Sequence, residues 1–137
     1  MPLLFHPQAG TILICDYPKD LRAPEMVKRR PVIVVSPKLK HRNDLVTVVP
    51  LSTTRPRIIM PYHHELTLNL PNPWDSAVCW AICDHPITVC FSRLNLIRGP
   101  KDRRGKRVYI QKTIVSEDLL ALKSGLAAAL GIEIKDK

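Results

Sequence analysis

Short β-type segments separated by proline constrain this chain more than any other feature. Thirteen of its 137 residues are proline, and proline interrupts both helices and interior sheet strands. The runs between these prolines are rich in Val, Ile, Leu and Thr, and residues 64–70 alternate so that Leu66, Leu68 and Leu70 share one face. Residues 32–35 are four β-branched residues in a row, which is typical of a strand buried on both faces. The pattern predicts strands over residues 11–17, 31–37, 45–52, 64–70, 77–84, 86–94 and 107–111.

One helix is predicted near the C-terminus. Ser116 is a suitable N-cap, two acidic residues follow it, and Gly131 can close the far end. Several short strands followed by one amphipathic helix predict an α+β fold that is mainly β, as a small, strongly bent sheet or barrel. We expect a single domain over residues 1–137, with its core at about 10–131. The stripe that docks the helix is predicted to be Leu119, Leu122, Leu126 and Leu130.

The charge of the chain is strongly positive and unevenly distributed. Lys and Arg number 21 against 12 acids, which gives +9. Much of the excess lies in two clusters, residues 28–42 and residues 98–107. Solubility alone favours interspersed charges, so segregated positive blocks favour a polyanion such as nucleic acid. No run approaches the ~18 apolar residues of a membrane span, and residues 1–10 lack the features of a secretory signal. We therefore expect a cytoplasmic protein without a membrane partner.

The cysteines raise the question of a metal site. Three of the four, at 79, 83 and 90, lie close to His85. Their spacing does not match the tight Cys-x2-Cys pairs of structural zinc sites. The alternation of the stretch places these thiols on strands, where a cysteine is usually a small buried hydrophobe. We expect no metal and no disulfide.

Three segments carry groups suited to phosphate chemistry. PEMVKRRP, residues 24–31, places an acid and cations before a buried strand, although an exposed ion pair would have the same sequence. VVPLSTT, residues 48–54, ends a strand in hydroxyls, which either donate to phosphate or form a turn. AICDHP, residues 81–86, ends a strand in Asp84, which is either a tuned carboxylate or a turn residue.

Together these segments resemble the PemK/MazF family of bacterial toxin–antitoxin ribonucleases, from Gly10 to about Gly131. The resemblance is carried by an arginine-proline before a Val-rich strand, followed some twenty residues later by a strand that ends in a proline and hydroxyls. The matching motifs are G-x-I-x-x-x-D from Gly10, E-x-x-x-x-RPVIVVSP from Glu25, TVVPLSTT from Thr47 and CDHPITV from Cys83.

The resemblance implies an SH3-like β-barrel with a terminal helix that forms a homodimer. It also implies cleavage of single-stranded RNA without a metal or other cofactor, and neutralisation by a cognate antitoxin. Arg30 falls on the family's catalytic arginine and Ser52 on its catalytic Thr or Ser. Glu25 matches an acid in the loop before that arginine, and Asp84 matches a carboxylate that some members use as a base. The residues expected to contact RNA are Lys28, Arg29, Thr53, Thr54, His63 and His64.

The sequence departs from the family at two positions. Thr11 stands where many members carry an acid, and Ile82 stands where some carry Arg or Lys. Because Ile82 cannot donate a proton, a nuclease built on this chain would depend on Arg30 as acid and electrostatic clamp. His63 and His64 would compensate, or would simply begin a solvated strand. Two other functions stay open: a non-catalytic RNA-binding barrel, and a toxin of the same fold that acts on DNA gyrase.

Overall fold

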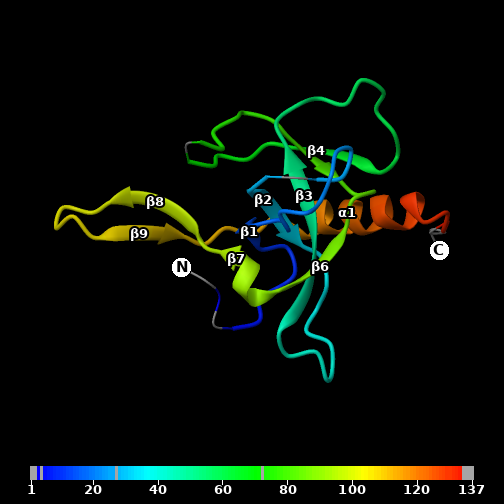
Figure 1. Cartoon of the computed structure of the whole chain (residues 1–137). Coiled ribbons are helices and arrows are strands. Elements are labelled where there is room, and N and C mark those ends of the chain that lie inside the picture. Colours follow the sequence, from blue (N-terminus) through cyan, green and yellow to red (C-terminus); the bar gives the residue numbers. More distant parts are fainter. Residues whose placement is uncertain (1–2, 4, 27, 72, 134–137) are drawn as a thin grey trace.

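The computed structural model describes residues 3, 5–26, 28–71 and 73–133, which form an antiparallel sheet, a separate hairpin and a C-terminal helix (Figure 1). The mainly β, α+β class predicted from the sequence is confirmed. The elements are β1 (Ile12–Cys15), β2 (Arg30–Val34), β3 (Leu45–Ser52), β4 (His63–Leu66), β5 (Cys79–Ile82), β6 (Ile87–Cys90), the 3-10 helix η1 (Phe91–Arg93), β7 (Leu94–Asn95), β8 (Ile97–Lys101), β9 (Arg107–Ile110) and α1 (Ser116–Ala129).

β3 is the central strand of the seven-stranded sheet. The order is β4-β5-β3-β2-β1-β7, and β6 also pairs with β3. On one edge β3 pairs with β2, and on its other edge it pairs first with β6 over Leu45–Val48 and then with β5 at Leu51 and Ser52. β6 and β5 therefore occupy successive stretches of the same edge of β3, so the sheet divides along β3.

Both faces of the central strands are buried. Val32, Ile33 and Val34 are each 0% exposed, so the prediction of a doubly buried strand is confirmed. Ile33 packs in a cluster with Ile12, Val49 and other residues, whereas Val32 packs with Leu13 and others on the opposite face. Successive strand residues point to opposite faces. β2 is therefore held from both sides, and its first residue has a fixed backbone position.

α1 covers the first of these clusters. Leu122 is fully buried, and Leu119 and Leu126 pack against the same cluster, as the predicted stripe requires. Leu130 does not belong to the docked stripe, because it is the C-cap residue and is 71% exposed. Gly131 closes the helix as predicted, with φ 75° and with the Ile132 amide donating to the Ala127 carbonyl at 2.7 Å.

The N-terminus of α1 differs from the prediction. The N-cap is Val115, which has an extended backbone and no capping side chain, and Ser116 is already the first helical residue. The Leu119 amide donates to the Val115 carbonyl at 3.0 Å, so the first helical hydrogen bond begins one residue earlier than expected. The acidic first turn, Glu117 and Asp118, is present as predicted. No helix among the described residues has the length and apolar character needed to cross a membrane.

Three segments differ from the predicted strands. The strand expected over 64–70 ends at Leu66, although Leu68 and Leu70 are buried in the core. The strand expected over 86–94 is interrupted by η1. The basic segment before residue 107 is not only a loop: residues 97–101 form β8, which pairs with β9 as a two-stranded sheet that projects from the body (Figure 1).

Candidate active site

Arg30 and Ser52 stand at the same level on neighbouring strands. β2 and β3 pair Val32 with Pro50 and Ile33 with Val49. Continuing this antiparallel register by two residues places Arg30 opposite Ser52, and residues opposite each other project from the same face. Both line one groove of about 300 Å³. The remaining described lining residues are Lys28, Arg29, Pro31, Leu51, Thr53, Thr54, Trp74 and Cys79.

The backbone of Arg30 is fixed on all sides. Arg30 begins β2, is opposite Cys15 of β1, and is followed by Pro31, which is buried. Its partly buried side chain also acts on a neighbouring phenol. Burial raises the pKa of Tyr17, Cys15 raises it further, and the positive charge of Arg30 opposes both effects. Arg30 therefore lies close enough to Tyr17, which lines a neighbouring groove, for its charge to act on this phenol.

Ser52 is held by a tight turn at the end of β3. Its Oγ accepts a hydrogen bond from the Thr54 amide at 3.1 Å. The contact from the Ser52 hydroxyl to the Thr54 carbonyl is 3.5 Å, at the limit for a hydrogen bond. Turn formation, the simpler reading of the STT sequence, is thus confirmed. The same turn fixes the oxygen and leaves its proton available to a ligand in the groove.

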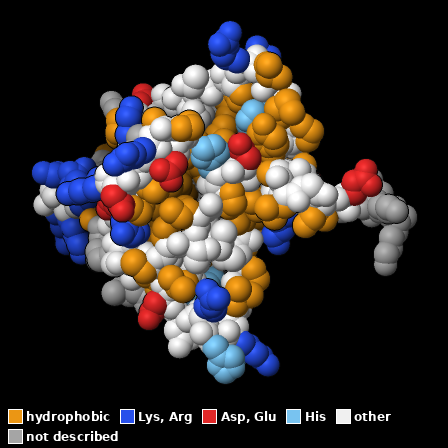
Figure 2. Space-filling view, turned by 45° about the vertical axis from the view of Figure 1, so that its right-hand side comes forward, with side chains coloured by type: hydrophobic (Ala, Val, Ile, Leu, Met, Phe, Trp, Pro, Cys, Tyr) orange, Lys and Arg blue, Asp and Glu red, His pale blue; other side chains and the backbone are white. Residues whose placement is uncertain are grey.

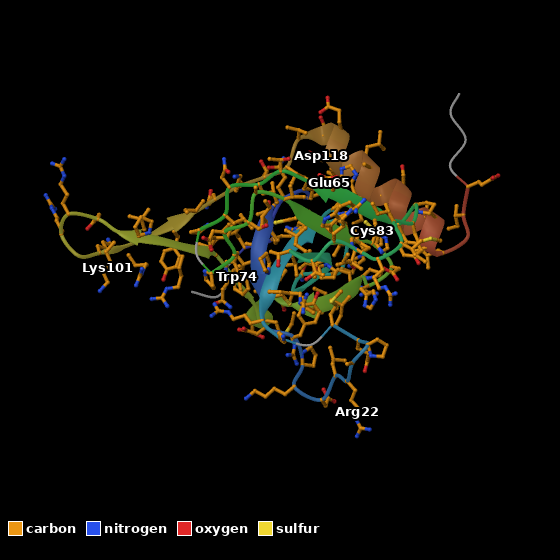
Figure 3. All side chains as sticks on the ribbon, turned by 90° about the horizontal axis from the view of Figure 1, so that it is seen from above. Arg22, Glu65, Trp74, Cys83, Lys101 and Asp118 are labelled. Carbon is orange, nitrogen blue, oxygen red and sulfur yellow. The ribbon has the colours of Figure 1, made fainter. Side chains whose placement is uncertain are left out.

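The two predicted carboxylates lie together in a different groove. Glu25 and Asp84 line a space of about 340 Å³ with Tyr17, Met26 and His85 among its other walls. The Glu25 Oε1 accepts a hydrogen bond from the Arg22 amide at 2.9 Å, and the Asp84 Oδ2 lies 3.7 Å from the His85 Nε2. The loop that carries Arg22 and the hairpin that carries Lys101 lie on different sides of the molecule (Figure 3).

The strand register explains this separation. Ser52 is opposite Trp80 on β5, and Asp84 lies four residues further along the chain. β5 ends at Ile82, and Asp84 lies in the turn that follows, where the His85 amide donates to the Ile82 carbonyl at 3.2 Å. The structure therefore brings together the cations and hydroxyls at one end of the strands, and the acids in the neighbouring groove.

Lys28 and Arg29 enter the Arg30–Ser52 groove from the loop before β2. Lys28 is exposed and has φ 89°, a left-handed conformation that is uncommon for a residue with a side chain. The Arg29 Nε lies 3.2 Å from the Asp16 Oδ1, and both side chains are about half exposed. Arg29 therefore keeps a partner while it lines the groove.

The two histidines make contacts that stabilise the fold elsewhere. The His63 Nδ1 accepts a hydrogen bond from the Met60 amide at 3.0 Å, and its ring packs edge-on against Tyr62. The His64 Nε2 lies 3.0 Å from the Asp118 Oδ1 and so joins β4 to α1. Neither histidine lines the Arg30–Ser52 groove.

The structure adds one residue that the sequence did not suggest, Trp74. It follows Pro71 and Pro73 in the chain, and its amide donates to the Pro71 carbonyl at 2.9 Å. Its side chain lines the Arg30–Ser52 groove and also an adjoining groove of about 500 Å³. A single tryptophan in a turn does not form a periodic pattern. The one signal in the sequence is an aromatic residue that follows two prolines.

The cysteines behave as buried hydrophobes on β5 and beside it. Cys79 and Cys83 are buried, and burial raises the pKa of both thiols, that of Cys83 to about 12. All four cysteines are free. Across the described ranges, no group of three or more His, Cys, Asp or Glu side chains is arranged to hold a metal ion. Cys90 differs, because it is partly exposed and a hydrogen bond with Ser92 lowers its pKa.

Comparison with solved structures shows which proteins share this fold. An endoribonuclease from a mycobacterial species, in complex with its cognate antitoxin, superposes with a TM-score of 0.62 at 19% identity, over 95% of this chain and 100% of that one. MazF from Deinococcus radiodurans superposes with a TM-score of 0.58 at 20% identity, over 92% of this chain and 97% of that one. At these identities the likeness establishes the fold.

Comparison of sequences establishes the family. The Escherichia coli (strain K12) protein YifN is 32% identical, over 72% of this chain and 78% of its own length. Residues 8–130 match the family described as PemK-like, MazF-like toxin of type II toxin–antitoxin system. This match covers nearly the whole chain, including β2, β3 and α1, so the protein belongs to the PemK/MazF family of toxins of type II toxin–antitoxin systems.

Proposed function

We propose that this toxin is an endoribonuclease that cleaves single-stranded RNA through attack of a ribose 2′-hydroxyl on the adjacent phosphate. The observation that carries the proposal is the groove that Arg30 and Ser52 both line. The relatives of the same fold that are named endoribonucleases support it. The groove lies within a molecule of net charge +9, which favours the approach of a polyanion.

The chemistry needs positive charge more than it needs a nucleophile from the protein. The 2′-oxygen forms a bond to phosphorus, the 5′-oxygen leaves with a proton, and a 2′,3′-cyclic phosphate is the first product. Arg30 is permanently charged and its guanidinium can donate two hydrogen bonds to the phosphorane oxygens. The Ser52 hydroxyl would donate to another of these oxygens. Because β2 and the 52–54 turn fix both groups, little reorganisation is needed at the moment of reaction.

The Arg30–Ser52 groove does not supply a base to accept the 2′-proton, since no acid is among its described lining residues. Glu25 and Asp84 remain the candidates, and both line the neighbouring groove with Tyr17. We expect only one of Glu25→Gln and Asp84→Asn to abolish cleavage, because an amide cannot accept the 2′-proton.

The test is incubation of the purified protein with single-stranded RNA in excess EDTA. Wild type should produce fragments with cyclic phosphate ends, and a 2′-deoxy substitution at the cleaved position should block them. Removing one preorganised donor typically costs about 10²–10³ in rate, so Arg30→Ala and Ser52→Ala should each fall by that factor. Lys123→Ala, which removes an exposed cation on α1 outside both basic clusters and the groove, is the control and should keep the wild-type rate. Equal cleavage by Arg30→Ala would refute the assignment.

A second function, RNA binding without cleavage, is favoured by one observation. The described lining of the Arg30–Ser52 groove contains cations and hydroxyls without a carboxylate. A groove of this kind binds phosphates whether or not a base is present. Salt-dependent binding by wild type with intact RNA recovered, and no growth arrest on expression, would establish this function in place of the nuclease.

As a type II toxin, the protein is expected to be neutralised by a cognate antitoxin, and we propose that it acts in the cytoplasm as a homodimer. The mycobacterial relative in complex with its antitoxin supports the first partner. Exposed apolar residues on α1, Leu120 at 63% and Leu130 at 71%, offer surface for either partner. Light scattering of the toxin alone, and after addition of the product of the neighbouring reading frame, tests both.

A further inference from the structure

The Arg30–Ser52 groove continues past the end of the strands. Arg29 and Trp74 line this groove and also the adjoining groove of about 500 Å³. The far wall of the adjoining groove is made by Arg98, Gly99, Pro100 and Arg107, which all belong to the β8–β9 hairpin. The two grooves thus share one wall, and a ligand seated at Arg30 can extend towards the hairpin.

Cations predominate along this continuous surface. Five of them line the two grooves, Lys28, Arg29, Arg30, Arg98 and Arg107, and the described lining residues include no acid. Asp16 lies beside the grooves, in an ion pair with Arg29 at 3.2 Å. By contrast, acids line two other grooves, Asp75 in one and Glu25 with Asp84 in the other. A run of cations along one path favours an extended polyanion as the ligand.

The hairpin is anchored at its base and charged at its tip. Ile97 is 1% exposed and pairs with Ile110, which packs against the core. The Asp102 Oδ1 accepts hydrogen bonds from the Arg104 and Lys106 amides, both at 2.9 Å, so the acid of the tip serves the turn. Lys and Arg side chains gather at the left edge of Figure 2.

Two details give the wall its shape. The Arg107 guanidinium donates to the Gly99 carbonyl at 3.0 Å, which holds it across the hairpin beside the groove. A Cβ on Gly99 would lie 3.0 Å from the Val108 carbonyl oxygen, a tight contact that would shift the two strands slightly apart. Trp74 lies between the hairpin and the sheet (Figure 3), which places a ring beside the path of the cations.

From this arrangement we infer that the groove between Trp74 and the β8–β9 hairpin is a second RNA-binding site, which holds the nucleotides next to the cleaved bond. Trp74 stacks on a base, and Arg98 and Arg107 bind the phosphates that flank it. Stacking on an aromatic ring is tolerant of base identity, so this site supplies affinity and direction without reading sequence. The inference rests on the proposed function for the adjacent groove, but it makes a separate prediction about binding.

The experiment measures binding of a short, fully 2′-O-methylated single-stranded RNA of mixed sequence, which cannot be cleaved, at several salt concentrations. Trp74→Leu should weaken binding about 5- to 150-fold, the range expected for one stacked base. Arg98→Gln should lower the slope of log K against log salt by about 0.7, one phosphate contact on a single strand. Lys123→Gln, an exposed lysine on α1 that lies outside both basic clusters and both grooves, is the matched control and should leave the slope unchanged.

A fluorescence measurement separates stacking from a structural role of Trp74. The chain has two tryptophans, and Trp80 is only 6% exposed. RNA should therefore quench the wild-type emission through Trp74. Trp74→Phe should retain most of the affinity but lose that quenching. Because Trp74 is partly buried, the thermal unfolding of each variant is compared with wild type, and the exposed Arg98→Gln variant gives a result that does not depend on folding.

Each outcome decides the inference. If Trp74→Leu and Arg98→Gln bind the uncleavable RNA as wild type does, with the same salt slope, the second site is refuted even if wild type cleaves RNA. If wild type binds RNA through Trp74 and Arg98 but cleaves none, the site stands and the nuclease is refuted. If the two variants lose binding to a polyglutamate peptide but not to RNA, the groove serves an acidic protein partner, and the inference is overturned.

Discussion

Gly125 allows α1 to approach the sheet more closely than any other residue type would. A Cβ built at Gly125 would lie 3.1 Å from both the Cβ and the Sγ of Cys83, and 3.4 Å from the Cα of Tyr62. Carbon atoms in contact prefer about 3.5–4.0 Å. The Sγ of Cys83 can rotate, but its Cβ is fixed to the backbone in a residue that is 0% exposed. An alanine here must therefore push the helix and the end of β5 apart.

Two opposing effects set the expected stability of Gly125→Ala. Alanine is favoured over glycine in a helix interior by about 0.8–1.0 kcal/mol. Overpacking a well-packed core costs about 1–3 kcal/mol. Because the contact involves backbone-fixed atoms, we expect the second effect to win, and the free energy of unfolding to fall by about 1 kcal/mol. The measurement is urea unfolding followed by circular dichroism at pH 7.

The control variants make this prediction specific. Lys123→Ala, exposed on the same helix, should change the free energy of unfolding by less than about 0.5 kcal/mol. In a Cys83→Gly background both of the atoms of residue 83 that lie 3.1 Å away are absent, so the penalty of Gly125→Ala should shrink towards zero. A Gly125→Ala variant more stable than wild type, or a penalty that Cys83→Gly leaves unchanged, would refute the reasoning.

Three further predictions follow from burial. Leu122→Ala should lower the free energy of unfolding by about 2–5 kcal/mol, whereas Leu130→Ala should change it by less than about 0.5 kcal/mol, as urea unfolding will measure. At pH 7.5 only Cys90 should react rapidly with a thiol reagent, and Cys90→Ser should abolish that fast phase; rapid reaction of a second thiol would contradict the assigned burial. Burial raises the pKa of Cys15 and Cys83 from 9.0 to about 12, so the folded chain keeps protons that the unfolded chain releases above pH 9. These thiols should thus leave the free energy of unfolding constant below pH 9 and lower it between pH 9 and 12. The fall should be less steep in Cys83→Ala. An unchanged slope in that variant would exclude the contribution of Cys83.

The sequence alone identified most of the elements because their signals are local. Four β-branched residues after Pro31 specify a doubly buried strand, and leucines at helical spacing specify the docked face of α1. The sequence also placed Arg30 and Ser52 at the ends of successive strands. When two strands pair antiparallel, the start of the first lies beside the end of the second. The strand patterns and the short connection between the two strands therefore predicted that Arg30 and Ser52 would line one groove.

The tertiary structure decided what depends on pairing over long distances. The placement of Asp84 in a different groove from Ser52 follows from the partner and register that β5 finds on β3, which are not encoded within either strand. Leu130 has the spacing of a core leucine, yet α1 ends at Ala129 and Leu130, as its C-cap residue, is exposed. The alignment of Trp74 with the β8–β9 hairpin likewise joins two segments that only the packed chain brings together. Local sterics and periodicity act over a few residues, whereas register and contact between distant segments are set by the burial of whole faces.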